Sequence, residues 1–277
     1  MTAWTLRSRA TSAGAAWGPV LALAGVWEGA SRLHWVDTEF FPPLSSVVAT
    51  VARMFIDGYL VVHVAISAAR AVGGFALALI VGIPAGLALG YAFPFAYSVA
   101  DPLLRLLSQV NPFSLLPVFL MLFGSGELAK LSAIAWTATW PIIFCTVTAV
   151  RGVDPNLIRL GRAMGASRAA VAYKVVLPAA MPTMFAGLRI ASTLVFFMLV
   201  GAEMLGGSVG LGWLVHNSAM NYQIRGIYAG ALLVIVLGYV VQVALATANR
   251  RLSVCDVAAS ASARDVPGEL TGGSYAP

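Results

Sequence analysis

The sequence predicts an all-α protein that crosses a membrane several times, and its composition is the first reason. Of the 277 residues, 60% are hydrophobic and only 10% are charged, and the mean hydropathy is +0.86. Soluble domains carry about 25% charged residues, so a soluble fold could not bury this much apolar surface. The composition therefore excludes an ordinary cytosolic enzyme, and it excludes a disordered chain, which requires low hydrophobicity. The second reason is that the apolar residues fall in long runs without charge.

These runs are long enough to span a bilayer, since a helix needs about 20 apolar residues to cross the hydrocarbon core. Five runs hold 18 to 30 uncharged residues, and a sixth, from Ile190 to Ala202, extends past the single acid Glu203. We therefore predict six transmembrane helices, near residues 14–33, 68–92, 102–123, 131–150, 184–205 and 227–248.

The first run has an alternative interpretation as a signal peptide. Arg7 and Arg9 would form the basic end of such a peptide. No clean small-x-small cleavage site precedes the charged stretch at residues 28–32, which favours a transmembrane helix.

The positions of the basic residues orient the six helices. An even number of spans places both termini on one side, and the side richer in Lys and Arg faces the cytoplasm. One side carries Arg7, Arg9, Arg105, Arg151, Arg159, Arg162, Arg168, Lys174, Arg250 and Arg251, and the other carries Arg32, Arg53, Lys130 and Arg225. We therefore predict that both termini are cytoplasmic. The net charge of +6 reflects this topology and does not indicate nucleic-acid binding.

This topology divides the chain into three parts. Residues 1–13 form a cytoplasmic N-terminus, residues 14–250 form the transmembrane domain, and residues 251–277 form a polar tail that we predict to be disordered. Cys145 and Cys255 show no metal-ligand or CxxC spacing. We therefore predict no metal, no cofactor and no catalytic residue.

The first segment outside the membrane, residues 34–66, is only partly apolar. Phe41-Pro42-Pro43 breaks the chain, and apolar residues then recur at helical spacing from Val47 to Phe55. This pattern predicts a helix over residues 44–55 that lies at the membrane interface.

Small residues recur every four positions in the second span, at Gly82, Gly86 and Gly90. Such a pattern lets another helix approach closely. It favours packing within one bundle, and the alternative is a sliding surface used in gating.

Polar residues inside the apolar runs are candidates for a transport pathway. Gln109, Asn111 and Ser114 cluster around Pro112, and backbone broken by proline is tolerated where it lines a cavity. Hydrogen bonding between helices explains the cluster equally well. Glu203 is an intramembrane acid and therefore a functional candidate. Because it lies near the outer end of its span, a structural role is at least as well supported.

The longest inside loop, residues 151–182, is predicted to begin with a helix. Asp154 can cap its free N–H groups, and Pro155 suits the first helical position. Leu157, Leu160 and Met164 form an apolar stripe, whereas Arg159 and Arg162 face elsewhere.

A second short helix follows in the same loop. Gly165 can end the first helix in a left-handed conformation, and Ser167 is placed to cap a helix through about Val176. Leu177-Pro178 then stops that helix. Such a rigid loop is built to present a short basic surface to a cytoplasmic partner.

This loop resembles a loop of a known protein family. Gly165, nine further residues, an aliphatic residue, any residue and then Leu177-Pro178 match the cytoplasmic EAA loop of binding-protein-dependent ABC importer permeases. Other segments resemble the nitrate/sulfonate/taurine branch, namely Phe41-Pro42-Pro43, Ser67 to Phe75, Gly82-Ile83-Pro84, Phe123-Gly124-Ser125-Gly126-Glu127, Gly152-Val153-Asp154-Pro155, Gly187-Leu188-Arg189-Ile190, Ala202-Glu203-Met204 and Gly210-Leu211-Gly212. The ordered set covers most of the chain.

The sequence departs from the family in one place. The family's Glu-Ala-Ala falls here on Arg159-Leu160-Gly161, so a base replaces the usual acid. Either the partner ATPase compensates, or the first helix of the loop packs differently.

The resemblance implies a type I ABC importer permease fold, an all-α bundle of six transmembrane helices that works as a dimer, here a homodimer, in the cell inner membrane. An external solute-binding protein delivers a small anionic solute, and each permease docks Ala166 to Val175 onto an ATPase subunit. ATP-driven closure of the ATPases would then switch the pathway from inward-facing to outward-facing. The implied coupling residues are Gly165, Ala166, Ser167, Arg168, Val171, Leu177 and Pro178. The chain has no GxxxxGK[ST] phosphate loop, so ATP is handled by another subunit.

Three other classes of protein are weighed against this one. An ion-coupled secondary transporter or channel would show inverted repeats and ionisable residues at the midplane, and neither is evident. A membrane enzyme is not indicated, because His34, His63 and His216 are scattered and are interpreted as ordinary surface or interface histidines. In a non-transporting scaffold, the inside loop would bind some other protein.

Overall fold

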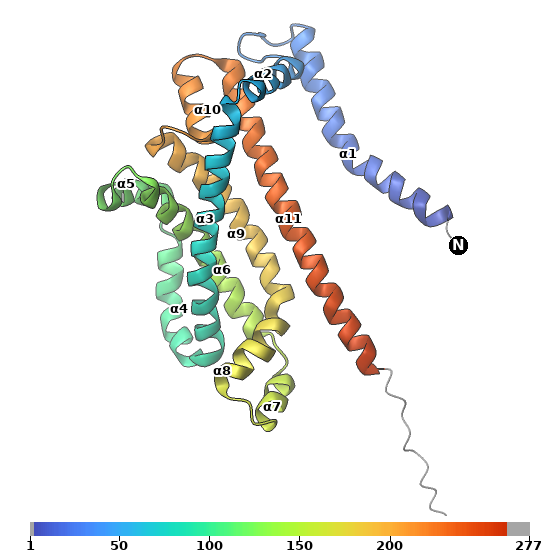
Figure 1. Cartoon of the computed structure of the whole chain (residues 1–277), viewed down its shortest axis with the longest axis vertical. Helices are drawn as coiled ribbons and strands as arrows, with labels where there is room; N and C mark the ends of the chain where they lie inside the picture. The colour runs from blue at the N-terminus through green and yellow to red at the C-terminus, as the bar shows by residue number, and fades with distance from the viewer. Residues whose placement is uncertain (1–2, 265–277) are drawn as a thin grey trace, which may run out of the picture. The chain divides into compact units, whose positions relative to one another are not determined.

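The structure is a computed structural model that describes the backbone of residues 3–264 and the side chains of residues 18–247. In this part of the chain all regular structure is helical, which confirms the all-α prediction (Figure 1). The elements are α1 (Ala3–Arg32), α2 (Leu44–Ile56), α3 (Tyr59–Leu87), η1 (Ala88–Ala92), α4 (Pro94–Ser108), α5 (Pro112–Phe123), α6 (Glu127–Arg151), α7 (Pro155–Ala163), α8 (Arg168–Val171), η2 (Ala172–Val176), α9 (Leu177–Gly206), α10 (Leu211–Met220) and α11 (Ile224–Arg264), where η marks a π-helical segment.

Four helical stretches within the described residues are long and apolar enough to cross a membrane. They are Tyr59–Ala92, Glu127–Arg151, Arg168–Gly206 and Ile224–Thr247. The bent pair α4 and α5 makes a fifth if it counts as one span. The predicted six is therefore not reached in this part of the chain. The first predicted span, residues 14–33, lies partly outside the residues whose side chains are described.

The predicted span over residues 102–123 consists of two helices in the structure, α4 and α5, which are bent by 86° where the sequence places Pro112. Pro112 opens α5, and the residue before a proline is disfavoured in the α conformation. Asn111 accordingly has ψ 119°, and its side-chain oxygen accepts a hydrogen bond from the Phe113 amide at 3.0 Å. The Asn111 side chain thus caps α5. The sequence shows that this residue is polar, but the cap was not predicted.

Two further boundaries differ from prediction at the ends of helices. The second span begins at Tyr59, before the predicted residue 68, because no helix-breaking residue lies between Gly58 (φ 72°) and the apolar run. At the other end of the chain α11 continues to Arg264, so residues 251–264 of the predicted disordered tail are helical. Residues 265–277 lie outside the described part.

Pro178 does not end the second loop helix, contrary to prediction. Residues Arg168–Gly206 form one continuous helical stretch that passes through η2. The Leu177 amide donates to the Ala172 carbonyl, five residues back, so the wider π turn comes directly before the proline. Pro178 directly follows this turn, and the wider π geometry accommodates a residue that has no N–H to donate.

The chain forms two compact units. The first comprises residues 1–74, 111–134 and 196–237. Its apolar core holds Leu60, Leu211 and Leu214. Trp27 of α1 donates to the Pro42 carbonyl at 3.0 Å and contacts the rings of Phe41 and Tyr228. The sequence correctly predicted a helix over 44–55, which is α2, whereas α10 was not predicted.

The second unit comprises residues 75–110, 135–195 and 238–277. Its core gathers buried residues from α3, α6, α8, η2 and α9, among them Leu87, Val150, Val171 and Met184. The repeated small residues face α6, since a Cβ on Gly86 would lie 2.5 Å from the Thr146 Cβ. Gly82 and Gly90 meet Ile142 and Val150 in the same way. The predicted close approach of two helices is therefore confirmed.

Candidate functional site

Three polar residues share one face of α3. His63, Ser67 and Arg70 are spaced by four and three positions, which places them one above another on a helix. All three are buried, with exposed fractions of 4%, 0% and 5%. Buried polar groups must be hydrogen-bonded, so this face of α3 requires partners from other elements.

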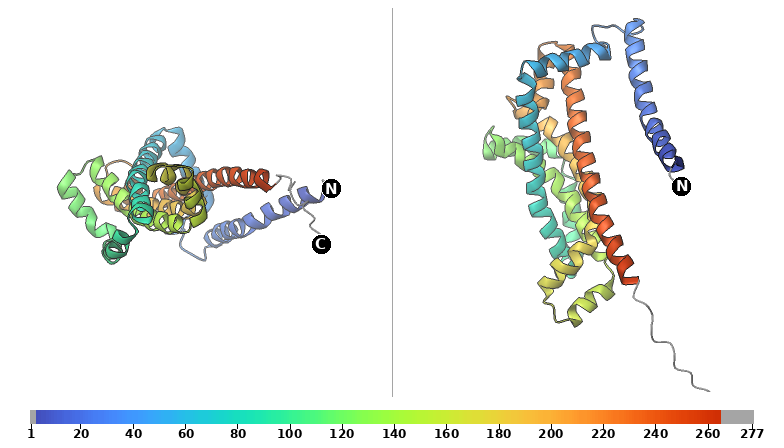
Figure 2. Two further views of the ribbon diagram at one scale, coloured as in Figure 1. Left: turned by 90° about the horizontal axis from the view of Figure 1, so that it is seen from below. Right: turned by 45° about the vertical axis from the view of Figure 1, so that its right-hand side comes forward.

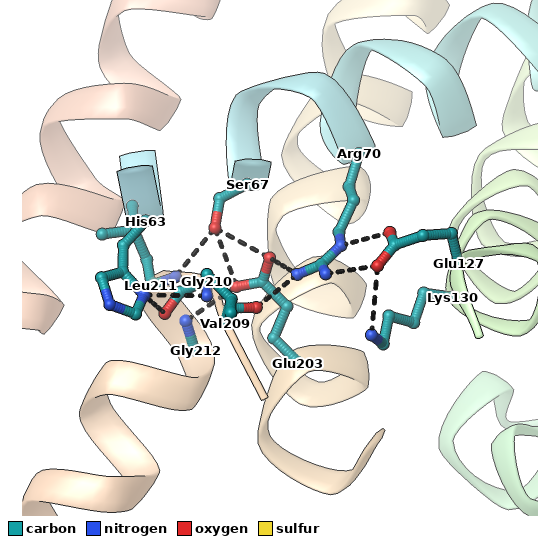
Figure 3. A network of polar contacts seen from close by, with 10 residues as sticks. All are labelled: His63, Ser67, Arg70, Glu127, Lys130, Glu203, Val209, Gly210, Leu211 and Gly212. Carbon is teal, nitrogen blue, oxygen red and sulfur yellow. Dashed lines mark hydrogen bonds and ion pairs between the residues drawn. The ribbon is translucent and has the colours of Figure 1, made fainter. Parts of the chain in front are cut away.

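Arg70 is the centre of the resulting network, in the first unit (Figure 3). Its Nε and Nη2 donate to the two carboxylate oxygens of Glu127, both at 2.6 Å. Its Nη1 donates to Glu203 Oε1 at 2.8 Å and to the Val209 carbonyl at 2.6 Å. The paired contact with Glu127 is the strong, planar form of a guanidinium–carboxylate pair. Arg70 therefore joins α3, α6, α9 and the segment after α9.

Glu203 is the most deeply buried member, with no exposed surface. Both of its oxygens lie within 2.8 to 2.9 Å of the Ser67 hydroxyl, and Oε2 accepts from the Gly212 amide at 2.8 Å. The Ser67 oxygen in turn accepts from the Leu211 amide at 2.8 Å. With the Arg70 contact, these donors compensate for the cost of burying a carboxylate.

His63 contacts the segment after α9 at Gly210 and at Trp213. The Gly210 amide lies 3.0 Å from His63 Nδ1, and the imidazole stacks on the Trp213 indole with an angle of 2° between the planes. If Nδ1 accepts this hydrogen bond, the ring proton lies on Nε2. Gly210 has φ 132°, a conformation that favours glycine, and a Cβ there would collide with the Glu203 carboxylate. His63 is thus a buried hydrogen-bonding residue, and its interpretation as an ordinary surface or interface histidine is wrong.

The charges of this network balance, with two cations and two carboxylates. Lys130 is also buried, and its Nζ lies 3.5 Å from Glu127 Oε1. A cavity of about 440 Å³ beside the network is lined by Arg70, Glu127, Ser208 and neighbouring residues. The described residues hold no group of three His, Cys, Asp or Glu side chains that could bind a metal. The arrangement can fix helix ends in place, and it can open only if ion pairs break.

The loop over residues 151–182 forms a capped hairpin in the second unit (Figure 2). The Asp154 carboxylate accepts from the Asn156 amide at 2.8 Å and starts α7. Gly165 has φ 78°, and Ser167 Oγ accepts from the Ala170 amide at 3.2 Å at the start of α8. The sequence therefore predicted this local geometry correctly.

The predicted coupling residues divide between the core and the surface. Val171 is fully buried, Ala166 and Leu177 are half-buried, and Arg168 and Pro178 are exposed. The predicted apolar stripe of α7 is also exposed: Leu157 is 45%, Leu160 60% and Met164 81% accessible. The apolar stripe of α7 is therefore left uncovered by the described residues of the single chain.

The candidate pathway residues differ in their exposure to solvent. Gln109, Asn111 and Ser114 are exposed on the single chain. Glu203 is buried in the network, so its carboxylate has no surface that could line a pathway in this conformation.

Comparison with known proteins agrees with this geometry. The family model of the binding-protein-dependent transport system inner membrane component matches residues 82–254. The chain belongs to this family. It is therefore a membrane-embedded permease of an ABC importer and not an enzyme, and ATP hydrolysis takes place on a separate subunit.

Individual proteins that are similar to this permease are also subunits of ABC importers. The taurine transport system permease protein TauC of Escherichia coli (strain K12) is 30% identical over 85% of this chain and 87% of its own length. The nitrate import permease protein NrtB of Leptolyngbya laminosa is 34% identical over 58% of this chain and 59% of its own length. A chain of the MetNI methionine ABC transporter, solved in inward-facing form, superposes with a TM-score of 0.60 at 23% identity, over 70% of this permease and 95% of that chain. The fold is thus that of a type I ABC importer permease, as predicted.

Sequence reasoning about the permease missed most of the buried network. It singled out Glu203, but it used Lys130 only as a topology-setting cation and met Ser67, Arg70 and Glu127 only as parts of the family resemblance. The signal that could have revealed the network is the spacing of His63, Ser67 and Arg70, which repeats with the period of a helix. A lone Arg in an apolar span also requires an acid partner, and Glu203 was available.

Proposed function

We propose that this permease imports a small anionic solute of the nitrate, sulfonate or taurine kind. A solute-binding protein outside the membrane delivers the solute, and a partner ATPase drives transport. The similarity to a taurine permease over most of both chains and to a nitrate permease over more than half supports this solute class. Family membership argues against the alternative of an ion-coupled secondary transporter or channel.

The hairpin of α7 and α8 is the observation that carries the coupling role. Its backbone is fixed by two side-chain caps and by Gly165, while Leu160, Met164 and Arg168 remain exposed. A rigid element with exposed apolar and basic side chains suits a docking role better than a connecting role. In this proposal Ala166 to Val175 docks onto the ATPase, and ATP-driven closure moves it.

The proposed assembly contains two copies of the permease, with both termini in the cytoplasm. The solute would pass between the copies, along a surface that includes Gln109, Asn111 and Ser114. Their exposure on the single chain supports this assignment. The excess of Lys and Arg on one side of the predicted topology supports the orientation.

The test is reconstitution of the permease with its ATPase and binding protein in proteoliposomes. We expect the ATPase to co-purify with the permease, and we expect uptake of labelled taurine or nitrate only when ATP and the binding protein are both present. The control is a vesicle with the ATPase omitted. Uptake that follows an ion gradient without ATP would contradict the proposal.

A further inference from the structure

The hairpin carries more positive charge than the acids among residues 18–247 neutralise. Residues 151–182 contain five cations and one acid, Asp154, and that acid is engaged in capping α7. Arg151 lies over the Tyr97 ring and donates to the Pro94 carbonyl. The remaining cations, Arg159, Arg162, Arg168 and Lys174, are exposed, and none of the ion pairs found in residues 18–247 includes them. Their charge is therefore available to a partner.

The structure places the base at position 159 on the exposed face of α7. Gly161 is buried, and a Cβ there would lie 3.4 Å from Val171 and from Val175, which is ordinary packing contact. The small residue at the end of the family's three-residue motif thus faces the hairpin core. Arg159, two positions earlier, points outward beside the exposed Leu160. Because Arg159 is exposed and Gly161 packs in the hairpin core, a base at position 159 changes the charge of the exposed face of α7.

Two of the arginines also border a cavity. A space of about 390 Å³ beside α8 is lined by Arg162, Arg168, Tyr91 and neighbouring small residues. The Arg162 guanidinium lies 6.0 Å from the Tyr91 ring centre, and its Nη2 lies 3.5 Å from the Tyr91 hydroxyl. Arginine binds carboxylates through two parallel hydrogen bonds and can bury against apolar surface. A carboxylate side chain from outside the chain fits this site by charge and by chemistry.

We propose that the groove of the ATPase subunit that receives this hairpin is lined by carboxylates. They pair with Arg159, Arg162 and Arg168, and the exposed Leu160 and Met164 supply the apolar contact at the centre of the interface. This inference rests on the proposed coupling role of the hairpin and adds the chemistry of the surface that it meets. Three of the four free cations are arginines flanking exposed apolar side chains, which is the composition of a protein interface.

Binding of the purified ATPase to the full-length permease in nanodiscs tests the inference. We expect Arg159→Glu and Arg168→Glu each to weaken binding by about tenfold or more, and the neutral Arg159→Gln to weaken it less. Raising the salt concentration should weaken the wild-type complex more than the complex of either Glu variant. Salt screens the charge pairs of the wild type, and each variant has already lost one of these pairs. The matched control is Arg53→Glu, which makes the same charge change on the exposed surface of α2.

The outcomes separate the inference from the function beneath it. If the wild-type permease does not bind the ATPase at all, the coupling role of the hairpin fails, and this inference fails with it. If the wild type binds but the two Glu variants bind equally well at every salt concentration, the coupling role stands and the acidic groove is wrong. The acidic groove is equally wrong if charge reversal changes only binding to anionic lipid vesicles. Rescue of Arg159→Glu by a carboxylate-to-lysine change in the ATPase groove would support the pairing directly.

Discussion

One guanidinium at Arg70 holds two carboxylates and a backbone carbonyl, all between 2.6 and 2.8 Å. A buried ion pair contributes little net stability relative to apolar residues, because both charges lose their hydration. Removal of one partner is costly, since it leaves the other charge buried and unpaired. The network therefore acts mainly by fixing which backbone groups meet, and the amides of Gly210, Leu211 and Gly212 are the groups that it fixes.

The first prediction concerns Glu203. Replacement by Ala removes the acceptor for Ser67, Arg70 and the Gly212 amide, and we expect the free energy of unfolding to fall by about 3–5 kcal/mol. Glu203→Gln should cost less, because an amide oxygen still accepts. The measurement is denaturant unfolding of the purified permease in detergent.

Glu127→Ala is the control for this prediction, because the Glu127 side chain is 58% exposed and water can replace it beside Arg70. We expect it to destabilise the permease less than Glu203→Ala does. Equal stability of Glu203→Ala and the wild type would show that the network has no structural role.

Among the secondary-structure elements, the hairpin of α7 and α8 depends on one backbone conformation. Gly165 has φ 78°, which costs residues with a side chain roughly 1–2 kcal/mol and is least tolerated by β-branched residues. No atom outside the neighbouring residues lies within 4 Å of a Cβ at this position, so the cost is one of conformation and not of space.

The second prediction follows from that geometry. Gly165→Val should distort the turn and uncouple solute transport from ATP hydrolysis, because α8 would no longer sit at a fixed angle to α7. The measurement is solute-stimulated ATPase activity of the reconstituted complex. Gly165→Asn is the matched control, since Asn tolerates the left-handed conformation, and it should retain most of the stimulation. Normal stimulation in Gly165→Val would count against a coupling role for the turn.

The proposed solute pathway is a property of the whole assembly, because two copies of the permease would form it. In a Cys145→Ser, Cys255→Ser background, we expect cysteines at Gln109, Asn111 and Ser114 to react with a polar thiol reagent at rates that change with nucleotide state. Asn111→Cys should also cost about 1 kcal/mol of stability, because it removes the α5 cap. The control is Asp57→Cys, which lies in the exposed turn between α2 and α3 and should react equally in every state. If none of the three pathway cysteines reacts in any state, these residues do not line the pathway.

The sequence by itself determined whatever depends on neighbouring residues along the chain. Apolar runs predicted the helices, Asp154 and Ser167 predicted caps, and Gly165 predicted a left-handed turn, because each of these features is settled within a few residues. The glycine repeat predicted a close helix contact, although the partner residues on α6 came only from the structure. The continuation of the helix past Pro178 was not predicted, since a single π turn there removed the usual effect of proline.

Only the tertiary structure decided which charges meet. Arg70, Glu127 and Glu203 are 57 and 76 residues apart along the chain, and sequence patterns contain no distance between groups so far apart. Folding brings them together because a charge buried among apolar helices is stable only beside an opposite charge. The same reason explains the opposite result in the hairpin, where no acid is supplied by the described part of the chain. There the arginines stay exposed, and the acidic groove that we propose on the ATPase would supply the neutralising charge.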